Sequence, residues 1–232
     1  MHIAVINFSG NTGKSTISDE VLAPRMPGAP VIRVESVNSG GRDVPTIRGD
    51  KFREIQEGVL TVTDSISDIG ASNVEDYLEG LNSFAGSHED LDFFVVPTVP
   101  DDKQMIDTIA TISALAGEIG VPREKIRVVF NRVSQRETIE VQFAPIFSWH
   151  KKARLCEINA GAAITENEIY SLLHGTNSSV VAVAEDPTDY RAMIPGATAD
   201  ERVHLARKVS LKRLAGAVKA EHDRVFSILT AR

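Results

Sequence analysis

Residues 10–16, Gly-Asn-Thr-Gly-Lys-Ser-Thr, have the composition and spacing of a loop that binds phosphate groups. The apolar run Ile3-Ala4-Val5-Ile6 precedes them, and a helix-like segment from Ile17 to Leu22 follows. A glycine-bearing turn between a strand and a helix aims backbone N–H groups and a helix N-terminus at one point, which suits a polyphosphate. Lys14 would reach the β- and γ-phosphates, and the Ser15 hydroxyl would bind Mg²⁺.

This loop departs from the usual pattern at its first position. A glycine normally stands five residues before the Gly-Lys pair, and here that position holds Phe8. The alternative interpretation is a glycine-containing turn with a surface lysine. The preceding strand and the following helix favour the phosphate-binding loop, because that motif needs both.

A carboxylate suited to a metal ion follows in a third apolar stretch, residues 62–69, which carries Asp64 and Asp68. Mg²⁺ keeps several waters and takes only one or two protein oxygens, so an acidic residue at the C-terminal end of a buried strand beside a phosphate loop suits it. Asp68 is therefore the candidate metal residue together with Ser15, and Asp64 is predicted to lie at a strand edge. The alternative role for Asp68 is the N-cap of the next helix.

The elements that would position these groups alternate between strands and helices. Strands are expected at 3–6, 31–34, 62–69, 93–97, 127–131 and 179–184, and helices at 17–22, 51–60 and 107–119. Residues 35–43 are polar and glycine-rich and are expected to form a loop. The alternation predicts an α/β fold with a mostly parallel twisted sheet, helices on both faces, and ligands at the carboxyl ends of the strands.

The chain of 232 residues is of ordinary globular composition, with 42% hydrophobic and 25% charged residues, and is expected to form a single domain, 1–232. Its net charge is −7, yet residues 200–232 hold eight Lys or Arg against four Asp or Glu, so this segment is +4 and the remainder −11. The spacing predicts a basic amphipathic helix at about 200–231. Its charged face is either solvated or a weak electrostatic footprint for DNA phosphates or an acidic partner.

We expect a cytoplasmic protein without a membrane span. No apolar run approaches the roughly 18 to 20 residues that cross a bilayer, and no basic segment precedes the first strand. The single cysteine, Cys156, cannot form an internal disulfide and is expected to be a small buried residue.

The chain resembles the ParA/MinD group of deviant-Walker P-loop ATPases, and within it the plasmid-stability proteins of the StbB type. The resemblance covers nearly the whole chain and rests on residues 6–15, 68–73, 94–100 and 127–133. It implies an ATP-dependent switch, in which two subunits close face to face over bound ATP and Mg²⁺ and hydrolysis reopens them. Such proteins position plasmids or other cargo with DNA or a DNA-bound adaptor, which implies a bacterial cytoplasm and association with the nucleoid.

The resemblance also implies roles for individual residues. Lys14, Glu35 and Asp43 would be catalytic, with Glu35 or Asp43 orienting the attacking water. Ser15 and Asp68 would organise Mg²⁺, and Asn131 would contact the adenine. The phosphates would lie against a run of consecutive residues: Ser9, Gly10, Asn11, Thr12, Gly13, Lys14, Ser15 and Thr16.

The sequence departs from this family at two positions. Members typically carry a lysine at the position of Ser9, which reaches across the dimer to the partner's phosphates. They usually end the second strand with two aspartates flanking one residue, where this chain has Glu35-Ser36-Val37. An added cation such as an arginine finger is worth about 10³ to 10⁵ in rate, so the absence of an evident one predicts slow basal turnover. The alternatives are a salt-bridged or solvated Glu35 and an Asn131 that caps a strand.

Two further function classes stay open. One is an ATP-dependent enzyme acting on a small molecule, similar to dethiobiotin synthetase, whose turnover would depend on that molecule. The other is a nucleotide-dependent scaffold that binds ATP without turnover. ATP is favoured over GTP, because Asn131-Arg132-Val133-Ser134 lacks the aspartate that reads the guanine edge.

Overall fold

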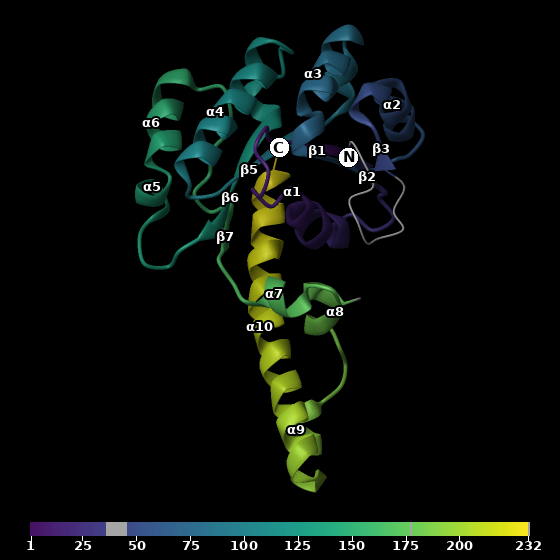
Figure 1. Cartoon of the computed structure of the whole chain (residues 1–232), viewed down its shortest axis with the longest axis vertical. Helices are drawn as coiled ribbons and strands as arrows, with labels where there is room; N and C mark the ends of the chain where they lie inside the picture. The colour runs from purple at the N-terminus through teal and green to yellow at the C-terminus, as the bar shows by residue number, and fades with distance from the viewer. Residues whose placement is uncertain (36–45, 177, 232) are drawn as a thin grey trace. The chain divides into compact units, whose positions relative to one another are not determined.

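The computed structural model describes residues 1–35, 46–176 and 178–231, which form two compact units (Figure 1). The first unit comprises Met1–Glu166 and Val225–Arg232, and the second comprises Asn167–Arg224. The single domain expected over residues 1–232 stays a prediction, because two compact units can still fold as one domain.

The first unit is built on a parallel sheet that has seven strands within the described residues, in the order β3-β2-β4-β1-β5-β6-β7. The strands are β1 (His2–Val5), β2 (Val31–Val34), β3 (Thr46–Ile47), β4 (Ser65–Ile69), β5 (Phe93–Thr98), β6 (Ile126–Val133) and β7 (Ala163–Thr165). Because β1 pairs with β4 on one side and β5 on the other, the residues after β1 leave the sheet at its centre. Ligands of parallel sheets bind where the strand order reverses in this way.

Helices cover both faces of this sheet (Figure 1). On one face lie α2 (Phe52–Leu60), α3 (Val74–Ser83), α4 (Asp102–Gly117) and α6 (Ala144–Ala153), with the short α5 (Ile139–Gln142) before α6. On the other face α1 (Lys14–Thr16) continues as a π-helical segment, Ile17–Leu22, which contacts β4. Burial on both faces explains why the central strands β1 and β5 are nearly continuous apolar runs. The predicted α/β fold is confirmed.

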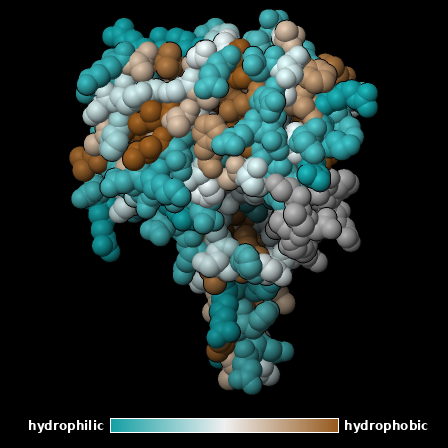
Figure 2. All heavy atoms as spheres, turned by 45° about the horizontal axis from the view of Figure 1, so that its top comes forward, coloured by the Kyte–Doolittle hydropathy of each residue, from teal (hydrophilic) through white to brown (hydrophobic). Residues whose placement is uncertain are grey.

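The helices on the first face expose a mostly hydrophilic surface, on which hydrophobic side chains form small separate groups (Figure 2). In α2, for example, Phe52, Ile55 and Val59 are buried while Arg53 and Glu54 are exposed. This spacing is that of an amphipathic helix with one face on the core. Among the described helices, none has the length and apolar character needed to cross a bilayer.

Several elements begin or end at other residues than expected. The helix predicted at 107–119 is α4, which begins at Asp102 because the Asp101 side chain caps it by accepting two backbone hydrogen bonds. The strand predicted at 62–69 begins only at Ser65, and Asp64 before it binds the N-terminal amino group at 2.6 Å.

The second unit is helical, with α7 (Ile169–Leu173), α8 (Val180–Ala184), α9 (Tyr190–Met193) and most of α10 (Ala199–Leu229), which lies where a basic helix was expected. The strand predicted at 179–184 is wrong. The Ser179 side chain accepts a hydrogen bond from the Ala182 N–H and starts α8, whose Val180 packs with Ala215 and Val218 of α10. A serine cap and packing on a helix thus override the strand preference of this valine-rich run.

Candidate nucleotide-binding site

The loop that joins β1 to α1 lies at the carboxyl end of the central strand. It passes through the left-handed region twice, at Asn11 with φ 58° and at Gly13 with φ 92°. Gly13 has a second reason to be glycine, since a Cβ there would collide with the Asn131 amide nitrogen. The chain therefore needs glycine at this position to turn tightly into the helix.

Asn7, which no motif in the sequence marks as functional, holds the first half of this loop. Its side-chain amide nitrogen donates to the Pro97 carbonyl and to the Thr108 hydroxyl, each at 2.8 Å, and its oxygen accepts from the Ser9 N–H at 2.7 Å. Next to it the Phe8 N–H donates to the Thr111 hydroxyl at 3.0 Å. The loop is thus fastened to β5 and α4, which explains how it keeps its shape with phenylalanine at the usual glycine position.

Lys14 lies inside the curve of the loop and is only 8% exposed. Its ammonium group donates to the Ser9 carbonyl at 2.7 Å and to the Asn7 carbonyl at 3.2 Å. Burial lowers the pKa of Lys14 from 10.5 to about 8, and the charges of Asp68 and Glu35 partly oppose this change. A buried cation held by loop carbonyls is ready to meet a polyanion, whose charge would favour the protonated lysine more strongly than Asp68 and Glu35 do.

Asp68 stands beside this lysine near the end of β4, as the sequence predicts for it. It is 3% exposed, and burial raises its pKa, while a hydrogen bond from the Ser15 side chain and the charge of Arg33 lower it. The Arg33 Nη1 lies 2.8 Å from Asp68 Oδ2. The alternative role of Asp68 as an N-cap is wrong, because Gly70 and Asn73 occupy the N-cap positions that follow β4.

Asn131 reaches the same loop from β6. Its amide nitrogen donates to the Thr12 carbonyl at 2.9 Å, and its oxygen accepts from the Arg132 N–H. The strand continues past it to Val133, so Asn131 does not end the strand as expected. In this structure Asn131 fastens the loop between β1 and α1, and its contact with adenine stays a prediction.

The remaining predicted site residues are the two candidates for orienting water, Glu35 and Asp43, and the residues of the loop itself. Glu35 is half-buried directly after β2, and its charge acts on Lys14, as noted above. Asp43 lies outside the described residues. The phosphate contacts predicted for Ser9, Gly10, Asn11, Thr12, Gly13, Lys14, Ser15 and Thr16 stay predictions. Of these, Ser9 already uses its N–H on Asn7 and its carbonyl on Lys14.

The arrangement fits a nucleotide with Mg²⁺. A turn that leads into a helix offers N–H groups to phosphate, and Lys14 offers a cation. The Thr12 hydroxyl is buried and has no hydrogen-bond partner in the described structure, which leaves a polar group for a ligand to satisfy. Ser15 is exposed and adjoins Asp68, so a hydroxyl and a carboxylate meet where a magnesium ion beside the phosphates would need them.

No family model and no curated protein matches the sequence. Solved structures do match: apo McdA from Cyanothece has 11% identity and a TM-score of 0.56, over 90% of this chain and 98% of that one. The MinD cell division protein of Aquifex aeolicus has 12% identity and a TM-score of 0.52, over 93% and 97%. The ParA protein pNOB8 ParA, bound to nonspecific DNA, has 10% identity and a TM-score of 0.51, over 96% and 98%. At these identities the likeness shows a shared architecture, and the chain therefore has the fold of the McdA, MinD and ParA proteins.

Proposed function

We propose that this protein is an ATP-binding, slowly hydrolysing switch of the ParA/MinD type that acts in plasmid partition or stability, as its StbB-like sequence features suggest. The observation that carries the proposal is the meeting of Lys14, Ser15 and Asp68 at the carboxyl ends of β1 and β4. A cation, a hydroxyl and a carboxylate at the start of a helix are the groups that a magnesium-bound nucleotide requires.

In this proposal each residue of the site has one task. Lys14 neutralises the β- and γ-phosphates, and the N–H groups of residues 10–16 orient them. Ser15 and Asp68 hold Mg²⁺, which when bound neutralises charge that develops on the transferred phosphoryl group. Glu35 or Asp43 orients the attacking water.

The slow rate and a scaffold-like alternative both follow from Ser9. Ser9 is only 6% exposed, and its backbone N–H and carbonyl are both hydrogen-bonded within the loop, to Asn7 and Lys14. A residue placed in this way supplies no cation to a second subunit, so rapid turnover would need a partner protein or DNA. The second candidate, a scaffold that binds ATP without hydrolysis, is favoured by this same observation.

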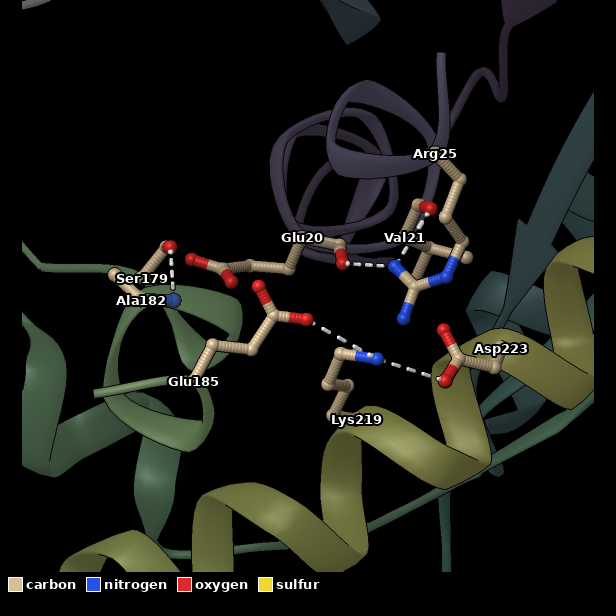
Figure 3. Close-up of polar contacts among 8 residues, drawn as sticks. All are labelled: Glu20, Val21, Arg25, Ser179, Ala182, Glu185, Lys219 and Asp223. Carbon is tan, nitrogen blue, oxygen red and sulfur yellow. Dashed lines mark hydrogen bonds and ion pairs between the residues drawn. The ribbon is translucent and has the colours of Figure 1, made fainter. Parts of the chain in front are cut away.

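The proposed partners are a second copy of the chain, bound through ATP, and DNA or a DNA-bound adaptor in the bacterial cytoplasm. Support for DNA comes from the fold neighbour pNOB8 ParA, which is bound to nonspecific DNA. Further support comes from the charges of the second unit. Lys219 pairs with Glu185 and Asp223 (Figure 3), whereas no ion pair within the described residues involves four other cations: Arg191, Arg207, Lys208 and Arg213. Such cations are available to phosphates.

The test is the mass of the protein by light scattering with ATP and Mg²⁺, with ADP, and without nucleotide, with Lys14→Ala as control. We expect a dimer with ATP alone and a monomer for the variant. A monomer that binds ATP would contradict the switch and favour the scaffold.

DNA binding is then measured by fluorescence anisotropy on a random duplex at several salt concentrations. The Arg207→Glu/Lys208→Glu variant should weaken it and reduce its salt dependence, whereas Arg123→Glu, at an exposed cation that pairs with Glu157, should not. Equal effects of the two variants would contradict the assignment of DNA to the second unit.

A further inference from the structure

Arg33 lies in the short apolar strand β2, where a charged residue is unexpected. Its Cα is paired in register with that of Asp68 on the neighbouring β4, so the two side chains lie on the same face of the sheet. One guanidinium nitrogen, Nη1, lies 2.8 Å from Asp68 Oδ2, and the other, Nη2, lies 2.6 Å from Asp19 Oδ1. The Arg33 side chain is 13% exposed. One partly buried cation therefore bridges two carboxylates from different elements.

The groups around Arg33 are the kind of oxygen ligands that a divalent cation takes. Asp19 and Asp68 supply carboxylate oxygens. The Ser15 hydroxyl, which is hydrogen-bonded to Asp68, supplies a third oxygen. Oxygen ligands of this kind are the ones that Mg²⁺ and Mn²⁺ take. The planar guanidinium fits between the two carboxylates. Its positive charge therefore occupies the position that a metal ion would take.

We propose that Arg33 is an internal counter-ion that prevents the Asp19–Asp68 pair from binding a divalent cation before nucleotide arrives. With Lys14 also close to Asp68, the empty loop holds two cations against these two carboxylates. Nucleotide phosphates add negative charge on the Lys14 side and shift the balance in favour of a metal ion. The metal thus enters together with the nucleotide.

The claim that nucleotide binding lets the metal enter rests on the proposed function. The claim that Arg33 keeps a metal ion away from Asp19 and Asp68 does not depend on it. A unit charge about 6 Å from a divalent cation changes its affinity about tenfold even at the dielectric constant of water. Removing Arg33 should therefore increase the affinity of the nucleotide-free protein for Mn²⁺ by at least that factor.

The experiment measures Mn²⁺ binding to the full-length, nucleotide-free chain by electron paramagnetic resonance. We expect no binding below millimolar Mn²⁺ for the wild type and for Arg33→Lys, which keeps the charge. We expect at least about tenfold tighter binding for Arg33→Gln, and loss of that gain in Arg33→Gln/Asp68→Asn. Thermal melts with and without Mn²⁺ provide a second readout, in which only Arg33→Gln is stabilised by the metal.

Two results would overturn the inference. One is an Arg33→Gln protein that is folded but binds Mn²⁺ no better than the wild type. The other is a nucleotide-free wild type that already binds Mn²⁺ at micromolar concentration, a test that needs no variant to fold. A wild type that binds neither ATP nor ADP would instead contradict the proposed function, and the comparison of Mn²⁺ affinities would still decide the role of Arg33.

Discussion

Replacing Lys14 by methionine should stabilise the nucleotide-free protein at pH 7 while abolishing nucleotide binding. Burial lowers the pKa of this lysine from 10.5 to about 8, so holding its charged form costs the folded state about 3 kcal/mol. Its two hydrogen bonds to loop carbonyls return about 1 kcal/mol each. The variant should therefore be about 1 kcal/mol more stable than the wild type.

The sign of the pH dependence follows from the same numbers. Between pH 8 and 10.5 the unfolded chain binds the proton of Lys14 and the folded chain has lost it, so the stability contributed by this group rises with pH. The advantage of Lys14→Met should therefore be full below pH 8 and should shrink as the pH rises through this window.

Urea unfolding of both proteins at pH 7 and at pH 10 measures this difference. Lys125→Met is the matched control, because Lys125 also donates to two backbone carbonyls, those of Glu89 and Leu91, but is half-exposed. Its replacement should only destabilise. If Lys14→Met lost stability at pH 7 as Lys125→Met does, the claim that burial makes the charged Lys14 costly to the nucleotide-free protein would be refuted.

Three further changes test how the site is held. Asn7→Ala removes three hydrogen bonds and should lower the free energy of unfolding by about 2 to 3 kcal/mol in a urea titration. A loss under about 0.5 kcal/mol would show that the loop keeps its conformation without Asn7. Gly13→Ala brings a Cβ against Asn131 at a positive φ and should weaken ATP binding at least about tenfold by calorimetry, so unchanged affinity would contradict the described loop. Asp101→Ala removes the cap of α4 and should cost about 1 kcal/mol by thermal melting without changing nucleotide affinity.

Much of the site's scaffold was predictable because it depends on local patterns. The order of apolar run, glycine turn, Lys14 and helix predicts a phosphate-binding loop, and parallel strands bring Asp68 to the same edge. The prediction from local patterns failed where tertiary packing determines the secondary structure. The run that forms α8 reads as a strand from its valines, and only its serine cap and its contacts with α10 make it helical.

The missed residues are those whose partners are far away in the sequence. Asn7 binds Pro97 and Thr108, and no spacing rule connects residues about 100 positions apart. Arg33 carried a signal that could have been used, because a charge within an apolar strand needs a buried partner, and Asp68 on the neighbouring strand is an obvious one. The role of Asn131 was open for the same reason, because its partner Thr12 lies 119 positions away in the sequence.

Whether nucleotide binds at the β1–α1 loop is decided by isothermal titration of the full chain with ATP and with GTP, each with Mg²⁺, and with Lys14→Met as the control. We expect that ATP binds one site per chain, that GTP binds much more weakly, and that the variant binds neither while remaining folded. Equal binding of ATP by Lys14→Met and by the wild type would place the nucleotide elsewhere and contradict the account.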